Sequence, residues 1–439
     1  IVLSLPFVQT KIGHYLTNWI NEGFGTDINV EQVAVSVFGG VKLKTILIKD
    51  HHKDTLIFAN RIKTNILDIG KMLNGDLIFG DIRLDGVVFN VKIYKGEDDS
   101  NIDKFIALFD SDKPSSGKKF LLEATNAYLT NTTFRVINEN LQTPKSVDFT
   151  KLNASLSTFK IYGPEVTTKI NKMSFKDHRG LKIDNLSGQF TYNTTNIILD
   201  NFLFNTKESN FKGSAKLLYD RKDFGDFINK VNFDVVFGEA TLSSNDIRYF
   251  YDELGKNQVF NIKGHVTGPL NNLMLNNLKL VDNKGTQVIG NVNFKNLFGE
   301  NEQRFYMKGD FYKVSSDYKN LTDLLPNVLG KKLPKILSKL GKFMVVGSAE
   351  VSVSEIKTDF FMKTQLGNIK SNLAMANIEN IDNAEYTGNV ELDNFDIGQF
   401  LSIKDIGIVS LDVAIKGKGF TEKYIDTYID GAVSSLIYN

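Results

Sequence analysis

Residues 260–266 read Phe-Asn-Ile-Lys-Gly-His-Val, in which apolar positions alternate with polar ones and a glycine stands in the apolar series. Successive side chains of a β-strand point to opposite faces, so the set from Phe260 to Val266 shares one face and the intervening polar residues share the other. The same split recurs at residues 305–311 and 409–415. This two-residue period predicts sheets with one apolar and one polar face.

Few helices are predicted to cover that apolar face. Between Phe120 and Asn439 helical spacing is found only near Asp246–Leu254 and near Leu321–Leu340, where Pro326 and Pro334 divide the pattern. Leaving a large apolar side chain exposed forfeits roughly 1.5–3 kcal/mol, so the face needs a cover. Two solutions remain open: two sheets packed as a sandwich or barrel, or one long curled sheet whose apolar face holds an apolar ligand.

The first hundred residues mix helical and strand patterns. Apolar residues from Val8 to Phe24 fall at helical spacing, and the rest of the segment alternates. The helical face comprises Val8, Ile12, Tyr15, Leu16, Trp19, Ile20 and Phe24. Strands are predicted at Ile28–Val37, Val41–Ile48, Leu56–Ile62 and Leu77–Tyr94, the last with turns at Gly80 and Gly86, and short helices at Ile66–Leu73 and Ile102–Phe109.

A degenerate repeat runs through the strand-rich region. Residues 290–297 parallel residues 388–395, and Ile262-Lys263-Gly264 parallels Ile415-Lys416-Gly417. Related segments start near Gly188, Gly213, Gly309, Gly347 and Gly431. Their irregular spacing indicates an array of similar hairpins and not a strict solenoid.

Composition and one polar stretch suggest how the chain is divided into regions. The sequence predicts an N-terminal helix at 1–24, a first β region at 25–110, a polar Ser-rich loop at 111–119, and a repetitive β region at 120–439 with a helical insertion near 321–341. The net charge is +1 and cysteine is absent. The charge balance argues against a nucleic-acid partner, and the lack of cysteine excludes disulfides, Cys-bound metals and thiol nucleophiles.

No motif for catalysis or cofactor binding is found. His51 and His52, with Asp50 and Asp54, could be imagined as a metal cluster, but they stand in a polar turn between strands, and we expect no metal there. Phosphate-loop, nucleophile-elbow and zincin patterns are missing. The sequence therefore predicts no enzyme, no cofactor and no metal.

A basic face is predicted on the Pro-interrupted helical segment, formed by Lys331, Lys332, Lys335, Lys339 and Lys342. These lysines could contact anionic lipid headgroups, or they could form the solvent-exposed side of a packed helix. We favour the second interpretation. At the other end of the chain, residues Ile1–Leu5 are too few to span a bilayer, which needs about 20 apolar residues. We expect them to be the tail of a signal anchor, and the alternative is an ordinary N-terminal helix with an apolar start.

Several segments resemble the TamB/AsmA-like family of envelope proteins. They are the N-terminal amphipathic helix, residues 28–35 (Ile-Asn-Val-Glu-Gln-Val-Ala-Val) and 38–43, then 48–50, 54–56, 75–86 and 101–106, and the strand units at 264–270 and 388–400. The resemblance covers most of the chain, but it consists of short patterned motifs without a signature residue. The family's C-terminal region is not recognisable, and we expect Asn439 not to be the natural end.

The resemblance implies a curled antiparallel β-sheet, the β-taco or repeating β-groove, that conducts phospholipid between the inner and outer membranes. It further implies an AsmA-like region at 25–110, a periplasmic location, an inner-membrane anchor and, for the TamB branch, an outer-membrane assembly barrel as partner. The candidate groove residues are Phe260, Ile262, Val266, Phe305, Met307, Phe311, Val345, Val351, Val390, Leu392, Val409, Leu411, Val413 and Ile415.

Two other interpretations compete with the lipid groove. A stack of β-sandwich domains could act as a structural scaffold for outer-membrane protein assembly or surface-layer attachment, and it would bury the candidate residues completely. An enzyme acting on a glycan would need clustered aromatic residues and two facing carboxylates, which the sequence does not clearly offer.

Overall fold

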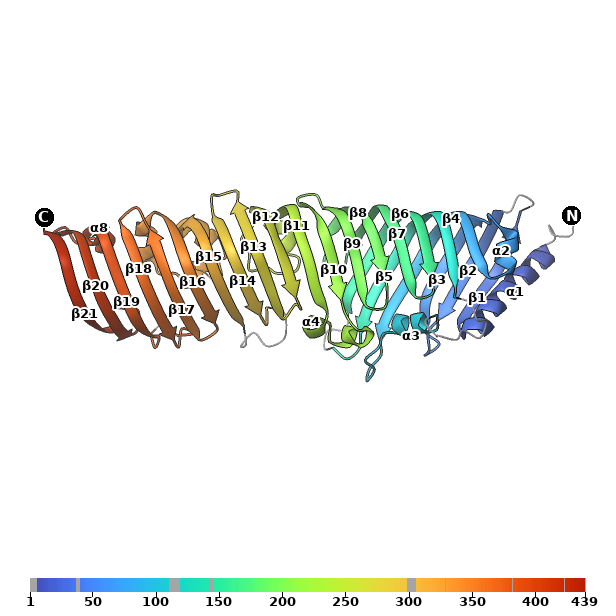
Figure 1. Ribbon diagram of the computed structural model, residues 1–439, viewed down its shortest axis with the longest axis horizontal. Coiled ribbons are helices and arrows are strands. Elements are labelled where there is room, and N and C mark those ends of the chain that lie inside the picture. Colours follow the sequence, from blue (N-terminus) through green and yellow to red (C-terminus); the bar gives the residue numbers. More distant parts are fainter. Residues whose placement is uncertain are drawn as a thin grey trace. The chain divides into compact units, whose positions relative to one another are not determined.

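The computed structural model describes residues 6–36, 40–109, 119–141, 145–297, 305–327, 329–380, 382–421 and 423–438. These residues form 21 strands and several short helices, so the protein is mainly β, as the alternation predicts. They divide into two compact units, Ile1–Asn232 and Phe233–Asn439, and Figure 1 labels the elements. The predicted anchor tail at Ile1–Leu5, residues 38–39 of the family motif and the predicted loop, apart from Lys119, lie outside the described residues.

The first unit, unit 1, contains ten strands. Its elements are α1 (Pro6–Phe24), β1 (Asp27–Val35), β2 (Gly40–Lys49), β3 (Thr55–Asn65), α2 (Ile69–Leu73), β4 (Asp76–Ile93), α3 (Asn101–Ala107), β5 (Leu121–Asn138), β6 (Lys145–Tyr162), β7 (Glu165–Asp177), β8 (Lys182–Tyr192), β9 (Asn196–Asn205), β10 (Asn210–Leu218), the 3-10 helix η2 (Arg221–Asp226) and α4 (Phe227–Lys230).

The second unit, unit 2, contains eleven strands. Its elements are β11 (Asn232–Ser243), α5 (Ser244–Ile247), β12 (Val259–Gly268), β13 (Asn272–Asp282), β14 (Gln287–Lys295), β15 (Tyr306–Asp317), α6 (Tyr318–Leu324), α7 (Leu329–Lys332), the 3-10 helix η4 (Lys335–Leu340), β16 (Lys342–Ser352), β17 (Glu355–Lys363), β18 (Asn368–Ala376), β19 (Glu385–Asp396), α8 (Ile397–Leu401), β20 (Ile406–Lys418) and β21 (Asp426–Tyr438).

Within unit 1 each strand from β1 to β10 pairs with the next one in the chain. The strands of unit 2 likewise lie side by side in chain order (Figure 1). Every pairing within unit 2 is antiparallel, from β11 with β12 to β20 with β21. Unit 1 departs from the expected antiparallel sheet once, because β4 and β5 pair in parallel from Asp76 opposite Leu121 to Ile93 opposite Asn138. A parallel pair needs a crossover connection, and the segment that carries α3 provides it.

The predicted strong curl is not observed. The sheet is mostly antiparallel and open, and it is neither closed nor strongly curled. In unit 2 the described strands pair only with their sequence neighbours, and β21 is the last of them. An open sheet keeps its apolar face accessible unless other elements cover it.

The degenerate repeat corresponds to a recurring backbone feature. Gly188, Gly264, Gly347, Gly388 and Gly431 all lie inside strands with φ between 145° and 157°. This region is sparsely populated by residues that carry a Cβ. At Gly388 an added Cβ would stand 1.9 Å from the carbonyl oxygen of Asn372 on the neighbouring strand. Glycine is therefore required by the sheet geometry at these five positions, whereas Gly213, Gly290, Gly309 and Gly417 of the repeat do not adopt a positive φ.

Bulges keep the apolar residues on one face where the sequence period breaks. Leu275 and Leu278 are three residues apart, and the register shifts between them. Asn277 absorbs the extra residue in a left-handed conformation, with φ of 51°. Asn394, with φ of 47°, does the same between Leu392 and Phe395. Asn tolerates this conformation better than most residues, which explains the asparagines inside these strands.

Helix α1 matches the predicted N-terminal helix and packs beside β1. Trp19, Ile20 and Phe24 from its predicted apolar face join a core cluster with Met72, Leu77 and Phe120. Tyr15 was predicted for the same face, but its exposed fraction is 62%. The side chains of Val8, Ile12 and Leu16 lie outside the described part of the structure.

Two other local predictions are wrong. The turns expected at Gly80 and Gly86 are not formed, because β4 is paired on both sides, with β3 and β5, and continues through both glycines. The helix expected at Asp246–Leu254 is limited to α5, since the chain beyond it turns toward α6, where the Gly255 amide donates to the Leu324 carbonyl. The predicted insertion near 321–341 is present as α6, α7 and η4.

Candidate functional site

An unbroken apolar row crosses every strand of unit 2. Each member is the direct cross-strand partner of the next, although the residues come from eleven different strands. The row is Ala240, Ile262, Leu280, Val288, Val314, Val345, Met362, Ile369, Leu392, Leu411 and Val433. We call it the unit 2 row.

The residues on either side of the unit 2 row on the same face are also mainly apolar or small. From Leu278 to Val390 a second series alternates large and small side chains, which leaves room beside the large ones, and Val413 then follows Val390. Its members are Leu278, Gly290, Phe311, Gly347, Phe360, Ser371, Val390, Val413 and Gly431. Together the two series form a wide apolar surface on one side of the sheet.

The fourteen groove candidates occupy this face on β12, β15, β16, β19 and β20, with Phe305 directly before β15. Three pairs among them are cross-strand partners: Met307 with Val351, Val390 with Val413, and Leu392 with Leu411. Phe260 and Val409 are each only 3% exposed, so they cannot contact a ligand in this structure. The other twelve are half-buried.

Sequence reasoning missed the strands that connect these candidates. Leu280, Val288, Met362, Ile369 and Phe360 belong to the same two series but were not selected. Apolar and polar residues alternate in β17 and β18 as regularly as in the strands that carry the candidates. This pattern could have identified Phe360, Met362 and Ile369. In β13 the bulge at Asn277 breaks the period between Leu275 and Leu278, which hides the face of Leu280, whereas Val288 lies in the regular alternation of β14.

The apolar face of unit 2 is covered only in part by the described residues. One core cluster is found there, formed by Leu340, Leu366 and Phe395. Leu337 from η4 and Ile397 and Phe400 around α8 pack against it, together with Met362, Ile369 and Leu392 of the unit 2 row. Short helices thus cover one end of the neighbouring strands, while most of the row remains half-buried and not sealed.

Unit 1 contains a comparable row across its ten strands. It consists of Val33, Leu43, Ile62, Leu84, Leu129, Ala154, Met173, Leu186, Phe204 and Phe211, each opposite the next. Its central part is better packed, since Leu152, Ala154, Leu156 and Ile170 belong to a buried cluster. The same organisation therefore appears in both units with different degrees of burial.

The opposite face of unit 2 is polar. Lys308 pairs with Glu350 at 2.9 Å and Lys370 with Glu391 at 3.4 Å, both across neighbouring strands. Hydrogen bonding to Lys308 lowers the pKa of the Glu350 carboxyl, and the same pair raises the pKa of the Lys308 ammonium. These exposed pairs indicate a solvated surface.

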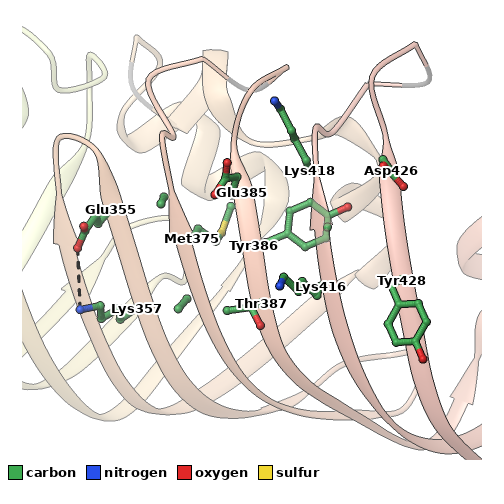
Figure 2. Close-up of a pocket in the computed structure, with 13 residues that line it drawn as sticks. Glu355, Lys357, Met375, Glu385, Tyr386, Thr387, Lys416, Lys418, Asp426 and Tyr428 are labelled. Atoms are coloured by element: carbon green, nitrogen blue, oxygen red, sulfur yellow. Dashed lines mark ion pairs between the residues drawn. The ribbon is translucent and has the colours of Figure 1, made fainter.

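A shallow hollow of about 620 Å³ lies over one end of β17 to β21 (Figure 2). Most of its lining residues lie on the polar face of these strands, among them Glu355, Lys357 and Lys416. The hollow is open at Ala374 and Ala376 because their side chains are small. None of the fourteen groove candidates lines it. It is therefore separate from the apolar rows, and its mixed charges do not define a ligand.

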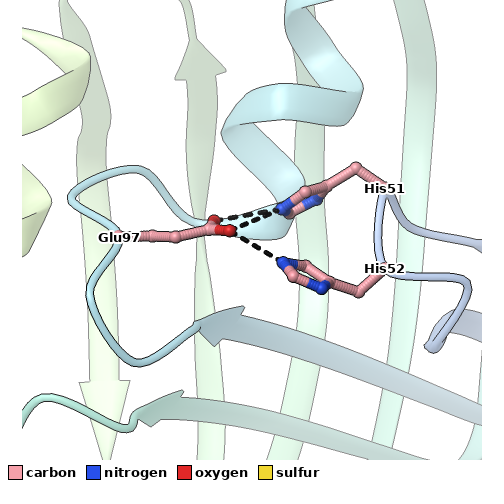
Figure 3. A group of neighbouring side chains, drawn as sticks. All are labelled: His51, His52 and Glu97. Atoms are coloured by element: carbon pink, nitrogen blue, oxygen red, sulfur yellow. Dashed lines mark hydrogen bonds and ion pairs between the residues drawn. The ribbon is translucent and has the colours of Figure 1, made fainter.

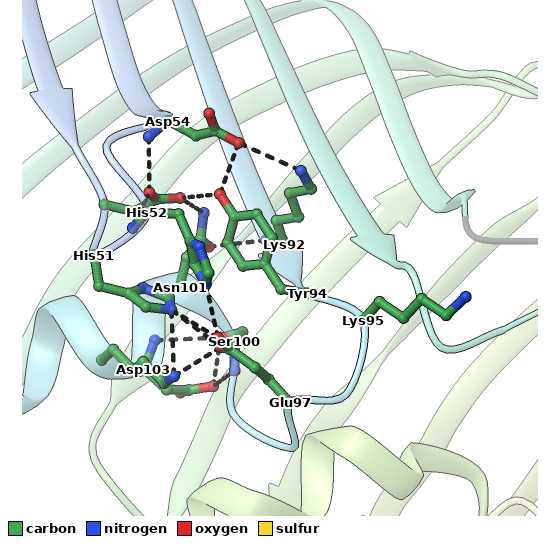
Figure 4. Close-up of polar contacts among 12 residues, drawn as sticks. His51, His52, Asp54, Lys92, Tyr94, Lys95, Glu97, Ser100, Asn101 and Asp103 are labelled. Carbon is green, nitrogen blue, oxygen red and sulfur yellow. Dashed lines mark hydrogen bonds and ion pairs between the residues drawn. The ribbon is translucent and has the colours of Figure 1, made fainter.

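A polar network joins the β2–β3 turn to the segment after β4 (Figure 4). The carboxylate of Asp50, which is 4% exposed, accepts hydrogen bonds from the Tyr94 hydroxyl at 2.7 Å and the Asn101 amide at 2.9 Å. It also accepts from the backbone amides of His52 and Asp54. Burial opposes ionisation of Asp50, but these donors together hold its pKa below the usual value. Asp50 therefore fixes the turn and is not available as a ligand.

Glu97 lies beside this network. Its carboxylate accepts hydrogen bonds from Lys104 at 2.7 Å and contacts His51 and His52. The Lys104 contact is the main reason why the pKa of Glu97 falls to about 2, and the His52 contact adds to it. The sequence grouped the two histidines with Asp50 and Asp54, whereas the structure brings Glu97 to them. No spacing signal in the sequence pointed to this residue.

One lysine of the predicted basic face, Lys339, contacts a neighbouring segment. Lys339 donates to the Phe400 carbonyl oxygen at 2.8 Å and to the Ser402 hydroxyl at 2.6 Å. Lys335 and Lys342 are exposed, and the side chains of Lys331 and Lys332 lie outside the described part. Lys339 therefore ties η4 to α8, which fits the wet side of a packed helix.

Among the helices of the described residues, none combines the length and apolar character that a membrane-spanning helix needs. Comparison with protein families, curated proteins and solved structures finds no match for this chain.

Proposed function

We propose that this chain is a lipid-transport protein that carries phospholipid acyl chains along the apolar face of its sheet. The observation that supports this most directly is the unit 2 row. It crosses eleven strands without a polar residue, and nine of its members are half-buried. A folded protein rarely leaves an apolar surface of this extent partly open unless something binds to it.

The physical requirements of acyl-chain binding agree with this arrangement. Burial contributes about 0.8 kcal/mol per methylene, so a wide apolar surface can hold a chain without specific contacts. The headgroup can stay in water, which means that a trough with modest curvature is sufficient. Neighbouring strands offer similar surfaces, so a lipid can move from one strand to the next without crossing a polar barrier. No catalytic step is part of this function.

The cellular setting follows the TamB/AsmA-like resemblance of the sequence. In this proposal the protein is anchored to the inner membrane, its groove-like sheet lies in the periplasm, and lipid passes between the inner and outer membranes. An outer-membrane assembly barrel is the proposed partner. These points are supported by the sequence resemblance and by the mainly antiparallel sheet with one apolar face.

The scaffold alternative makes a different prediction about burial. A β-sandwich would cover the apolar face with a second sheet and leave its inward side chains almost inaccessible. Of the fourteen candidates, only Phe260 and Val409 are buried to that degree. The half-buried majority favours lipid binding.

Adjacent residues on β20 allow a matched test. Val413 lies on the apolar face opposite Val390, whereas Ala414 is exposed on the other face. A photo-crosslinking amino acid placed at each position in turn should label phospholipid from Val413 and not from Ala414, as measured by mass spectrometry after irradiation in cells. Val413 tests the row, and Ala414 controls for general exposure to membrane lipid.

Two results would contradict the proposal. One is equal lipid labelling from Val413 and Ala414, which would show that the apolar face has no preference for lipid. The other is labelling from Val413 by protein only, which would favour the scaffold. Extraction of the purified chain adds an independent measurement, since a lipid carrier should retain phospholipid after purification without detergent.

A further inference from the structure

We propose that His51, His52 and Glu97 form a binding site for one divalent transition-metal ion, for which Zn²⁺ is the appropriate probe. One ligand atom from each side chain lies within 4.8 Å of the others (Figure 3). The His52 Nε2 atom is 2.7 Å from Glu97 Oε1, and the His51 Nε2 atom is 3.3 Å from the same oxygen. Two imidazoles and one carboxylate are a donor set that suits zinc and its neighbours in the first transition series.

The distances require little movement for an ion to enter. Zinc binds imidazole nitrogen and carboxylate oxygen at about 2.0–2.2 Å, so tetrahedral ligand atoms stand about 3.4 Å apart. The observed nitrogen to Oε1 distances of 2.7 and 3.3 Å are shorter than this by about 0.7 and 0.1 Å. The three side chains are 28%, 46% and 23% exposed, which leaves them free to adjust and leaves a position for water.

The surroundings hold the ligands in place. Glu97 Oε2 accepts from Lys104 at 2.7 Å and lies 3.0 Å from His51 Nε2, whereas Oε1 contacts both imidazoles. The Tyr94 ring packs against His52 at 4.0 Å and against His51 at 5.6 Å between ring centroids. Such contacts around the ligands orient them and limit the entropy that an ion must overcome.

Lys104 is also a competitor for the site. Its ammonium is 3.2 Å from the Nε2 atom of His51, so its positive charge stands beside the position that a metal ion would take. Binding of the ion therefore requires Lys104 to leave His51 while it keeps its contact with Glu97 Oε2. Lys104 is partly exposed, at 36%, so its side chain can make that movement.

The ligands come from two separate segments, the β2–β3 turn and the loop between β4 and α3. Bridging them with an ion would fasten the turn to this loop at one end of the strands of unit 1. A ligand that binds the folded state alone stabilises it, so the unfolding temperature should rise with the concentration of Zn²⁺.

The test uses the full chain without an affinity tag, stripped of metal by chelation. Isothermal titration with Zn²⁺ should show one ion per chain, and Co²⁺ should give the visible absorption bands of an ion bound by nitrogen and oxygen. The double variant His51→Ala/His52→Ala and the single variant Glu97→Gln should each weaken Zn²⁺ binding at least tenfold. His265→Ala is the matched control, because His265 contacts Asp234 in unit 2 and should leave binding unchanged.

The proposal is overturned if the double variant binds Zn²⁺ as tightly as the unchanged chain, or if His265→Ala weakens binding to the same degree. Circular dichroism checks that each variant keeps its β-structure. If a variant fails to fold, the Co²⁺ spectrum of the unchanged chain decides, since the absence of these bands also overturns the proposal.

Discussion

Phe360 and Phe361 stand next to each other on β17 and face opposite sides of the sheet. Phe360 is half-buried in the apolar series, between Gly347 and Ser371, whereas Phe361 is 37% exposed on the polar face. We predict that Phe360→Ser weakens binding of an acyl chain and that Phe361→Ser does not. Because the two changes are chemically identical, the difference between them reports the face and not the residue type.

The expected size of the effect follows from contact area. A Phe side chain offers about 200 Å², and half of it, about 100 Å² at about 25 cal/mol per Å², corresponds to about 2.5 kcal/mol. This free energy amounts to a change of about 60-fold in Kd. The small neighbours Gly347 and Ser371 cannot replace the lost contact, so little compensation is expected.

The assay is titration of a lysophospholipid with a fluorescent acyl chain, below its micelle concentration, into each purified variant. Urea denaturation of the same samples separates a binding defect from a loss of fold. The reasoning is refuted if both variants change the Kd equally, or if Phe360→Ser leaves it unchanged while the chain stays folded. Either result would show that the apolar face of β17 does not contact the lipid.

Three further predictions concern stability. Gly388→Ala should destabilise unit 2 by about 1–3 kcal/mol, because φ is 155° and the new Cβ would meet the Asn372 carbonyl; urea unfolding measures it. Phe395→Ala should cost about 3–5 kcal/mol, since this side chain is 1% exposed in the Leu340 cluster, and a smaller loss in calorimetry would contradict the assigned packing. The hydrogen bond from Lys308 lowers the pKa of the Glu350 carboxyl below 4.5. The small stabilisation by this ion pair is therefore fully present above pH 4.5 and is lost as the pH falls through the lowered pKa. Urea midpoints of Glu350→Gln should therefore differ from those of the unchanged chain at pH 7 and coincide in strong acid.

Much of the fold could be predicted from the sequence because alternation reports directly on the sheet faces. The split between Ile262 and Lys263, or between Val413 and Ala414, requires no knowledge of distant parts of the chain. Bulges were harder to predict, since Asn277 and Asn394 adopt positive φ only in the context of a neighbouring strand. A period that breaks by one residue looks like the end of a strand, although the strand continues.

Contacts between distant segments could not be predicted in this way. The parallel pairing of β4 with β5 depends on the crossover that carries α3, and local alternation is the same for parallel and antiparallel neighbours. Glu97 reaches the histidines across 46 residues of sequence, whereas Asp50 and Asp54 are adjacent to them. Proximity in sequence therefore pointed to Asp50 and Asp54, whereas Asp50 is buried and accepts hydrogen bonds from Tyr94 and Asn101.

The side chains of the unit 2 row are more exposed on β21 than on the inner strands, and this difference is relevant to lipid binding. Val345, Met362 and Leu392 in the inner strands are half-buried, because neighbouring strands on both sides shield them. On β21, which has a described neighbour on one side alone, Val433 is 59% exposed, although it occupies the same row. Lateral neighbours thus account for much of the burial, and in the described part of unit 2 the core cluster near η4 and α8 covers the row from above. An acyl chain lying across the strands could still reach side chains that are shielded mainly by their lateral neighbours. In a packed sandwich the second sheet would block that approach.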